Sequence, residues 1–200
     1  MAGPALTVPR IAQALAGREP VLRPGAGDRA AVALLLHEPA DEAAPRLLVI
    51  ERARREGDPW SGDLAFPGGR VEPGDADERA AAERETAEET AVDLAAARFL
   101  GRLDDLSATL LPMTVAAFVY FVESVAVPAL SLSDEVTQAF WVPLPDFFDR
   151  RRRREHRLRR GTTEHRFPAL DLLGPGRPLL WGLTYRFTLS LGELVAEDLG

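Results

Sequence analysis

The chain has 200 residues, 46% of them hydrophobic, which predicts one globular domain with a sizeable core. It has no cysteine, which excludes disulfides, thiolate nucleophiles and cysteine-based zinc sites and is typical of a cytoplasmic protein. The net charge is −7 although residues 150–160 hold eight Arg and one Glu, and this acidity elsewhere argues against nucleic acid as the main partner.

Residues 1–27 are rich in Pro, Gly and Ala and are expected to form an extension ahead of a main domain at 28–200. Within the extension, Thr7 followed by Pro9 is a helix start signal that predicts a short helix over residues 7–15. The N-terminus lacks a basic region followed by an apolar one, and no stretch approaches about 18 uninterrupted apolar residues. Neither a secretory signal nor a membrane partner is therefore expected.

Two apolar runs predict the first strands of the main domain. Residues 30–36 form a continuous apolar run bounded by turn residues, which suits a strand buried on both faces. Residues 46–52 form the next predicted strand, which ends at Arg52. Trp60 follows a charged loop, where its ring could stack on a nucleobase or anchor the loop onto the core.

A glycine pair and an acidic helix follow in the middle of the chain. Gly68 and Gly69 predict a tight turn, because glycine tolerates positive φ at no steric cost. After a loop, Asp77 is placed to cap a run of strong helix formers that extends to about Thr90.

Three glutamates of this predicted helix are candidate metal ligands. Glu85, Glu88 and Glu89 stand three and four residues apart, so their carboxylates project from one side. Like charges at that spacing destabilise a bare helix, and a hard cation such as Mg²⁺ or Mn²⁺ would explain why they cluster. The alternative is a solvated helix face in an acidic protein.

The second half of the chain is richer in predicted strands. Strands are predicted at residues 97–103, 113–122, 139–144 and 166–170. Residues 145–148 are predicted to begin a helix, and a C-terminal amphipathic helix is predicted from about residue 187 to 196. Strands alternating with a few helices imply an α/β or α+β sandwich.

The Arg-rich residues 150–160 allow three interpretations. The segment could be a solvated helix end or a mobile segment, a phosphate clamp whose guanidinium forks match phosphate oxygens, or a contact for RNA. The three histidines stand at spacings unlike any zinc motif, and each is expected to be structural or solvated. They are His37, His156 and His165.

The stretch from Gly68 to Thr90 resembles the box of the Nudix hydrolases, which cleave diphosphates linked to another moiety. The shared order is a Gly-Gly turn, an acidic loop and Arg-Glu-x-x-Glu-Glu. This box has one residue more than the commonest form, so Asp75 and Asp77 are the acids nearest to the usual loop glutamate. Ala91 stands where Gly is usual and is expected to be tolerated. The resemblance implies an α/β fold, the Nudix α/β/α sandwich with a mixed β-sheet, over residues 28–200.

Two regions are similar to the coenzyme A pyrophosphatase branch of that family. One is Phe66-Pro67-Gly68-Gly69 with two aspartates in the following loop, and the other is the Leu-Trp-Gly-Leu-Thr segment at residues 180–184. This resemblance implies Mg²⁺-dependent hydrolysis of coenzyme A or its derivatives to 3′,5′-ADP and 4′-phosphopantetheine. The alternatives are an ADP-ribose or ADP-sugar pyrophosphatase and a non-catalytic nucleotide-sensing module.

The resemblance also assigns roles to residues. It makes Glu85 and Glu89 the best metal ligands, Glu88 the next, and Arg84 a structural residue that pairs with an acid to aim them. Outside the box, Glu135 and Asp134 are candidate general bases; the alternative is that either residue caps the turn. Candidate substrate-binding residues are Arg52, Trp60, Gly68 and Gly69. The expected partner is a small nucleotide; dimers are common in the family, although no stretch of this chain requires a homodimer.

Overall fold

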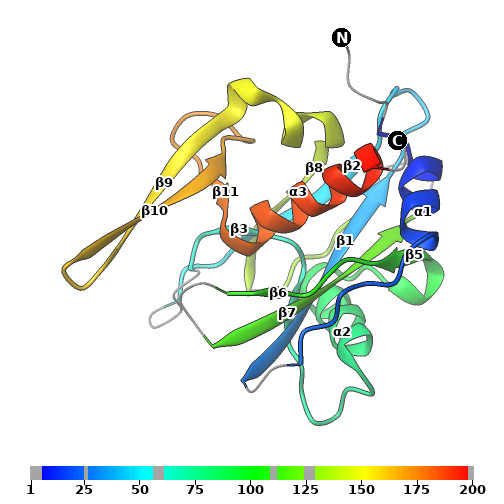
Figure 1. Ribbon diagram of the computed structural model, residues 1–200, viewed down its shortest axis with the longest axis horizontal. Coiled ribbons are helices and arrows are strands. Elements are labelled where there is room, and N and C mark those ends of the chain that lie inside the picture. Colours follow the sequence, from blue (N-terminus) through cyan, green and yellow to red (C-terminus); the bar gives the residue numbers. More distant parts are fainter. Residues whose placement is uncertain (1–5, 25–26, 56–60, 109–111, 124–128, 198–200) are drawn as a thin grey trace.

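The computed structural model describes residues 6–24, 27–55, 61–108, 112–123 and 129–197, and its centre is a mixed sheet (Figure 1). In these ranges the sheet has eight strands, with the path β3-β2-β1-β7-β5 and with β4 on β1, β6 on β7 and β8 on β2. The strands are β1 (Asp28–His37), β2 (Arg46–Arg52), β3 (Leu64–Ala65), β4 (Gly68–Arg70), β5 (Arg98–Arg102), β6 (Leu106–Ser107), β7 (Met113–Phe121) and β8 (Val136–Pro143).

The centre of the sheet is the parallel pair β1 and β7, and the other pairs are antiparallel. Both central strands are buried on their two faces, as their continuous apolar sequences predict. In β1, Leu34 and Leu36 pack into one core while Ala33 and Leu35 pack into the other. The period of two along a strand thus divides one apolar run between two layers.

Helices cover both faces of the sheet. Helix α2 (Glu78–Thr90) packs against β1, β4 and β7, whereas α1 (Val8–Ala16) and α3 (Gly182–Glu197) contact each other and cover the opposite core. The fold is therefore the α/β/α sandwich that the sequence predicted. The predicted N-terminal helix is α1, and its Val8, Ile11 and Leu15 are buried in the same core as α3.

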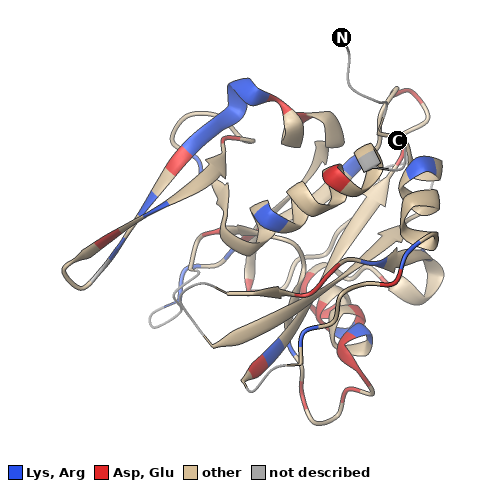
Figure 2. Ribbon diagram, in the orientation of Figure 1, with Lys and Arg blue, Asp and Glu red and all other residues tan. Residues whose placement is uncertain are grey.

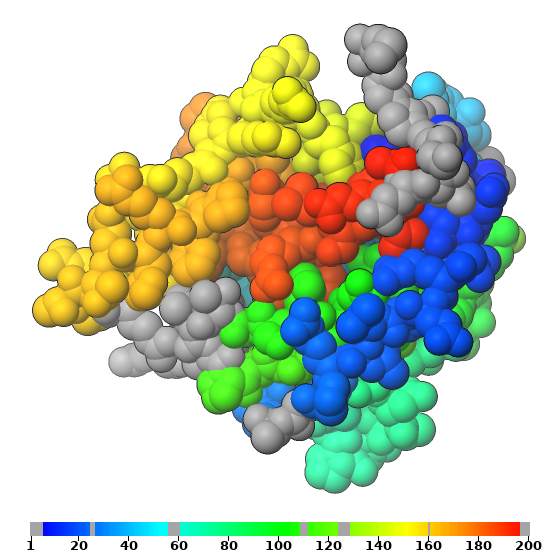
Figure 3. Space-filling model, viewed as in Figure 1, coloured from blue at the N-terminus to red at the C-terminus, as the bar shows by residue number. Residues whose placement is uncertain are grey.

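A second sheet of three strands stands beside the sandwich. It contains β9 (Arg153–Arg160), β10 (Thr163–Leu170) and β11 (Leu180–Trp181), all antiparallel. Strands β9 and β10 form a hairpin that projects beyond the rest of the surface in the space-filling view (Figure 3). Strand β11 leads directly into α3.

The prediction of a helix end or mobile segment at residues 150–160 is wrong. The segment forms a 3₁₀ turn (Arg150–Arg152) followed by strand β9, which pairs along its whole length with β10. The strand was missed because arginines at most positions hide the alternation in which His156 and Leu158 are the less exposed residues. The helix expected to open at 145–148 is also only a 3₁₀ turn (Leu144–Phe148).

None of the helices in the described ranges is both long enough and apolar enough to span a membrane.

Helix α2, which carries the box residues, has a side-chain cap at its start and a left-handed residue at its end. The Asp77 side chain accepts the Ala80 N–H at 2.8 Å, which satisfies one of the free donors of the first turn. At the other end, Ala91 adopts the left-handed conformation, with φ 59° and ψ 20°. Glycine is the usual residue in this conformation, because a Cβ is strained there.

Replacing Ala91 by Gly should therefore raise the free energy of unfolding by about 0.5–1 kcal/mol, measured by urea unfolding followed by circular dichroism. Ala87→Gly is the matched control, because Ala87 is exposed within the same helix, and that change should lower the free energy by about 1 kcal/mol. Equal losses in the two variants would contradict a left-handed Ala91.

Candidate active site

The prediction of a tight turn at Gly68 and Gly69 is wrong, because the glycine pair begins strand β4 and pairs with β1. A cavity of about 640 Å³ opens beside this pair. Part of its wall comes from the box, through Gly68, Gly69, Glu85 and Glu89. The start of α3 and the end of β11 supply another part, together with β10. The cavity therefore joins the acidic helix of the middle of the chain to its C-terminal elements.

The glycine pair lets the carboxylates of α2 approach the backbone of β4. Gly68 has φ +146°, and a Cβ there would lie 2.2 Å from the carbonyl oxygen of Ala31 on the neighbouring strand. A Cβ on Gly69 would lie 2.4 Å from Cδ of Glu85. No side chain fits at either position without displacing strand β1 or the Glu85 carboxylate.

The backbone of Gly68 in strand β4 holds Glu89 in a buried position. Its side chain is 3% exposed, and Oε2 accepts the Gly68 N–H at 2.9 Å. Arg52 Nη1 lies 3.9 Å from the other oxygen. Burial raises the pKa of Glu89 to about 7, against the Gly68 N–H and Arg52, which lower it, while Glu85 and Glu135 raise it further.

Glu85 is the second carboxylate at the cavity. Burial raises its pKa, the ion pair with Arg84 opposes this rise, and the negative charges of Glu88 and Glu135 add to it. The two carboxylates of α2 that line the cavity, Glu85 and Glu89, therefore stand in an environment that already disfavours further negative charge.

Arg84 ties the box together. It donates to both carboxylate oxygens of Asp75, at 2.9 and 3.1 Å, and its Nη1 donates to Glu85 at 3.0 Å and to Glu88 at 3.3 Å. The Arg84 hydrogen bonds hold the pKa of Asp75 below its usual range. Of the two loop acids, Asp75 is thus the partner of Arg84, while Asp77 caps the helix.

The other predicted residues differ in their distance from the cavity. Arg52 and Glu135 line it, and Glu135 is paired with Arg55 at 2.9 Å. Glu88 has a side chain 59% exposed and Asp134 one 93% exposed, and neither is among the residues that line the cavity. Trp60 lies outside the described residues.

The acidic residues have the oxygen ligands that a hard divalent cation binds, but they are not arranged as a complete metal site. In the described part of the chain, no three acidic or histidine side chains stand in a metal-binding arrangement. Glu89 is bound to Gly68, and Glu85 and Glu88 to Arg84. Carboxylate oxygens are nevertheless the ligands that Mg²⁺ and Mn²⁺ prefer, and burial, with a smaller part from neighbouring carboxylates, raises the pKa of both Glu85 and Glu89, which a nearby cation would oppose.

Sequence reasoning missed part of the cavity wall. Phe167, Trp181 and Asp63 line it, yet the sequence analysis placed Phe167 only in a predicted strand and linked only the segment of Trp181 to function. Trp181 reaches the site because its indole N–H donates to Asp63, which is 118 residues away in the chain. No local pattern carries that information.

Comparisons with known proteins agree with this architecture. The family model of the NUDIX domain matches residues 27–164. An uncharacterised protein of Schizosaccharomyces pombe is 37% identical over 112 residues, which are 52% of this chain and 33% of that protein, so the chain spans about a third of this relative's length.

Two solved structures share the fold. The MutT/nudix family protein from Enterococcus faecalis has a TM-score of 0.57 at 16% identity, over 96% of this chain and 70% of its own. A NUDIX hydrolase from Alicyclobacillus acidocaldarius has a TM-score of 0.50 at 21% identity, over 64% of this chain and 84% of its own.

The raised pKa of Glu89 predicts a pH-dependent stability in the absence of metal. The folded protein holds the Glu89 proton up to about pH 7, whereas the unfolded chain releases it near 4.5. The contribution to the free energy of unfolding is therefore fully present below 4.5 and is lost as the pH rises through 7. Glu89→Gln carries no charge and should lack this loss.

Between pH 5 and pH 8, in EDTA, Glu89→Gln should gain stability relative to the parent by an amount on the order of 1–3 kcal/mol. Urea unfolding at several pH values measures this difference, with Glu83→Gln on the same helix as the control. Parallel pH profiles for Glu89→Gln and the parent would show that Glu89 titrates normally.

Proposed function

The chain belongs to the NUDIX family of hydrolases, and we propose that it hydrolyses a phosphoanhydride bond in a nucleoside diphosphate linked to another moiety. The observation that carries this proposal is that Glu85 and Glu89 lie against the glycine pair of strand β4 at one cavity. A diphosphate that enters this cavity meets two carboxylates whose charge a divalent cation would balance.

Glu85 and Glu89 would hold Mg²⁺ or Mn²⁺, with Glu88 able to join them by rotating away from Arg84. When bound, the cation supplies charge neutralisation at the phosphates and lowers the pKa of water. Glu89 would have to give up its proton on binding, which its pKa of about 7 allows at neutral pH. Arg84 would aim the glutamates from its position between Asp75 and Glu85.

Arg52 is the guanidinium of the cavity that stands nearest to Glu89, and we assign it to the phosphate oxygens. Gly68 and Gly69 also line the cavity, and we assign them to substrate binding. Trp60 stays a predicted substrate-binding residue.

Glu135 is our choice for the general base, because it lines the cavity and Asp134 does not. Its carboxylate would accept a proton from the attacking water as the new P–O bond forms. The bond from phosphorus to the bridging oxygen then breaks, and two monophosphates leave.

Coenzyme A or one of its derivatives is the substrate we propose, with 3′,5′-ADP and 4′-phosphopantetheine as products. Support comes from the two segments that resemble that branch, because residues of both line the same cavity: Phe66, Gly68 and Gly69 from one, and Trp181, Gly182 and Leu183 from the other. Location in the cytoplasm and assembly into a homodimer stay predictions from the sequence.

A panel of substrates tests the function directly. With Mg²⁺ present, the protein should cleave coenzyme A faster than ADP-ribose, NADH, diadenosine polyphosphates or nucleoside triphosphates, as measured by chromatography of the products. Preferred cleavage of ADP-ribose would instead indicate an ADP-sugar pyrophosphatase. Tight binding without any cleavage would indicate a nucleotide sensor.

Removing a ligand carboxylate should abolish most of the activity without unfolding the chain. Glu85→Gln and Glu89→Gln should each lower kcat about 100-fold or more, because each removes a negative oxygen from the site. Glu83→Gln is the matched control, since Glu83 lies on the same helix but binds Arg79 and Tyr120. If the three variants have equal kcat values, Glu85 and Glu89 hold no catalytic cation.

A further inference from the structure

A second part of the cavity wall is made of aromatic rings from the three-stranded sheet. Phe167 of β10 and Trp181 of β11 line the cavity, and both lie beyond residue 164, where the family match ends. The chemistry-bearing box and this aromatic wall therefore come from separate parts of the chain.

The rings are arranged as a layered stack. The indole of Trp181 lies 4.2 Å from the ring of His156, centroid to centroid, at an interplanar angle of 16°. The ring of Phe167 lies 5.1 Å from the indole at 41°. His156 does not line the cavity, so it backs the indole. Burial lowers the pKa of His156, which keeps this backing ring uncharged at neutral pH.

Strand register explains why these rings share one side of the sheet. His156 and Phe167 are directly opposite each other, and Trp181 is opposite Ala169, two residues along from Phe167. Directly opposed residues, and residues two apart on a strand, lie on the same face.

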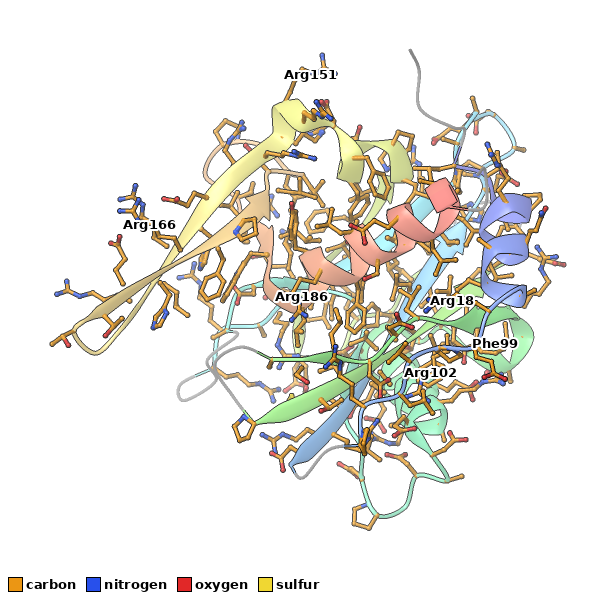
Figure 4. All side chains as sticks on the ribbon, viewed as in Figure 1. Arg18, Phe99, Arg102, Arg151, Arg166 and Arg186 are labelled. Carbon is orange, nitrogen blue, oxygen red and sulfur yellow. The ribbon has the colours of Figure 1, made fainter. Side chains whose placement is uncertain are left out.

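The other face of the hairpin carries Arg157 and Arg166, whereas Arg154 is two residues from His156 and shares its face. Arg157 and Arg166 are directly opposite each other and exposed, one position out of phase with the aromatic residues. The basic residues colour most of β9 and the turn before it (Figure 2), and Arg151 and Arg166 point away from the body of the molecule (Figure 4). The face that bears Phe167 and Trp181 therefore borders the cavity.

A short series of contacts links the indole to the buried carboxylate. The Trp181 N–H donates to the Asp63 carboxylate at 3.0 Å, and the Asp63 carbonyl oxygen accepts the Arg52 N–H at 3.0 Å. The Arg52 guanidinium lies 3.9 Å from Glu89. The indole is therefore fixed in orientation, and it stands beside the residues to which we assign the phosphates.

We propose that Trp181, backed by His156 and flanked by Phe167, is the stacking platform for the nucleobase of the substrate. This inference rests on the proposed function, since it names the part of the diphosphate that the C-terminal sheet recognises. Aromatic side chains bind nucleobases by stacking because every base has a π face. The ligand class is then a nucleotide, and a diphosphate that carries only sugar or polyol groups lacks the ring that the platform holds.

Two variants of similar apolar character separate stacking from simple packing. Trp181→Leu removes the π face, and Trp181→Phe keeps one. We would titrate the full chain with AMP and with ribose 5-phosphate, which lacks the base, and follow binding by NMR. Trp181→Leu should raise the Kd for AMP about tenfold or more, whereas Trp181→Phe should change it less than about threefold. Neither should alter binding of ribose 5-phosphate.

Three results would overturn the platform: no AMP binding by the parent, an unchanged Kd in Trp181→Leu, or equal losses for AMP and ribose 5-phosphate. If circular dichroism shows that Trp181→Leu does not fold, Phe167→Leu takes its place with the same expected loss for AMP alone, and an unchanged Kd there is contrary. A parent that binds AMP through Trp181 but cleaves no diphosphate would contradict the proposed function and leave the platform standing.

Discussion

The hydrogen bond from the Gly68 N–H to the buried carboxylate of Glu89 joins the two elements on which the site depends. It connects strand β4 to helix α2 across the position where a side chain on residue 68 would strike the Ala31 carbonyl. A carboxylate removed from water loses much of its solvation, and one N–H with a distant guanidinium compensates only partly. This incomplete compensation for the lost solvation raises the pKa of Glu89.

The elements around this bond are fixed by pairing and packing, which keeps the carboxylates close together despite their repulsion. Strand β4 pairs with β1, and β1 pairs along nine consecutive residues with the parallel strand β7 at the centre of the sheet. Helix α2 packs on the same strands, and Arg84 fixes its acidic face to the loop through Asp75. The carboxylates are held together by the fold even though they repel one another.

Local sequence patterns predicted the box well because its structure is local. The Asp77 cap, the helix to Thr90 and the single-sided glutamates all follow from residues within a few positions of one another. The same holds for β1 and β7, whose apolar runs are long enough to identify them as buried strands. The α/β/α arrangement followed from the resemblance that these residues carry.

The parts that could not be predicted depend on distant contacts. Strand β9 exists because β10 pairs with it, and its arginines gave no apolar signal of their own. Trp181 enters the cavity wall through an acceptor, Asp63, that directly precedes β3, and β3 itself has only two residues. Glu88 was predicted to project from the same side as Glu85 and Glu89, but its side chain is 59% exposed, pairs with Arg84 and does not line the cavity.

The division of the cavity between two segments has a consequence for how such a protein can diverge. The acidic residues depend on two glycine positions where a Cβ would strike neighbouring atoms, whereas Phe167 and Trp181 come from strands β10 and β11 and lie beyond residue 164, where the NUDIX match ends. With the roles proposed above, mutation of the hairpin would change the substrate that is bound while the acidic residues stay intact. Paralogues with the same box would then differ in the substrate that they bind rather than in the reaction.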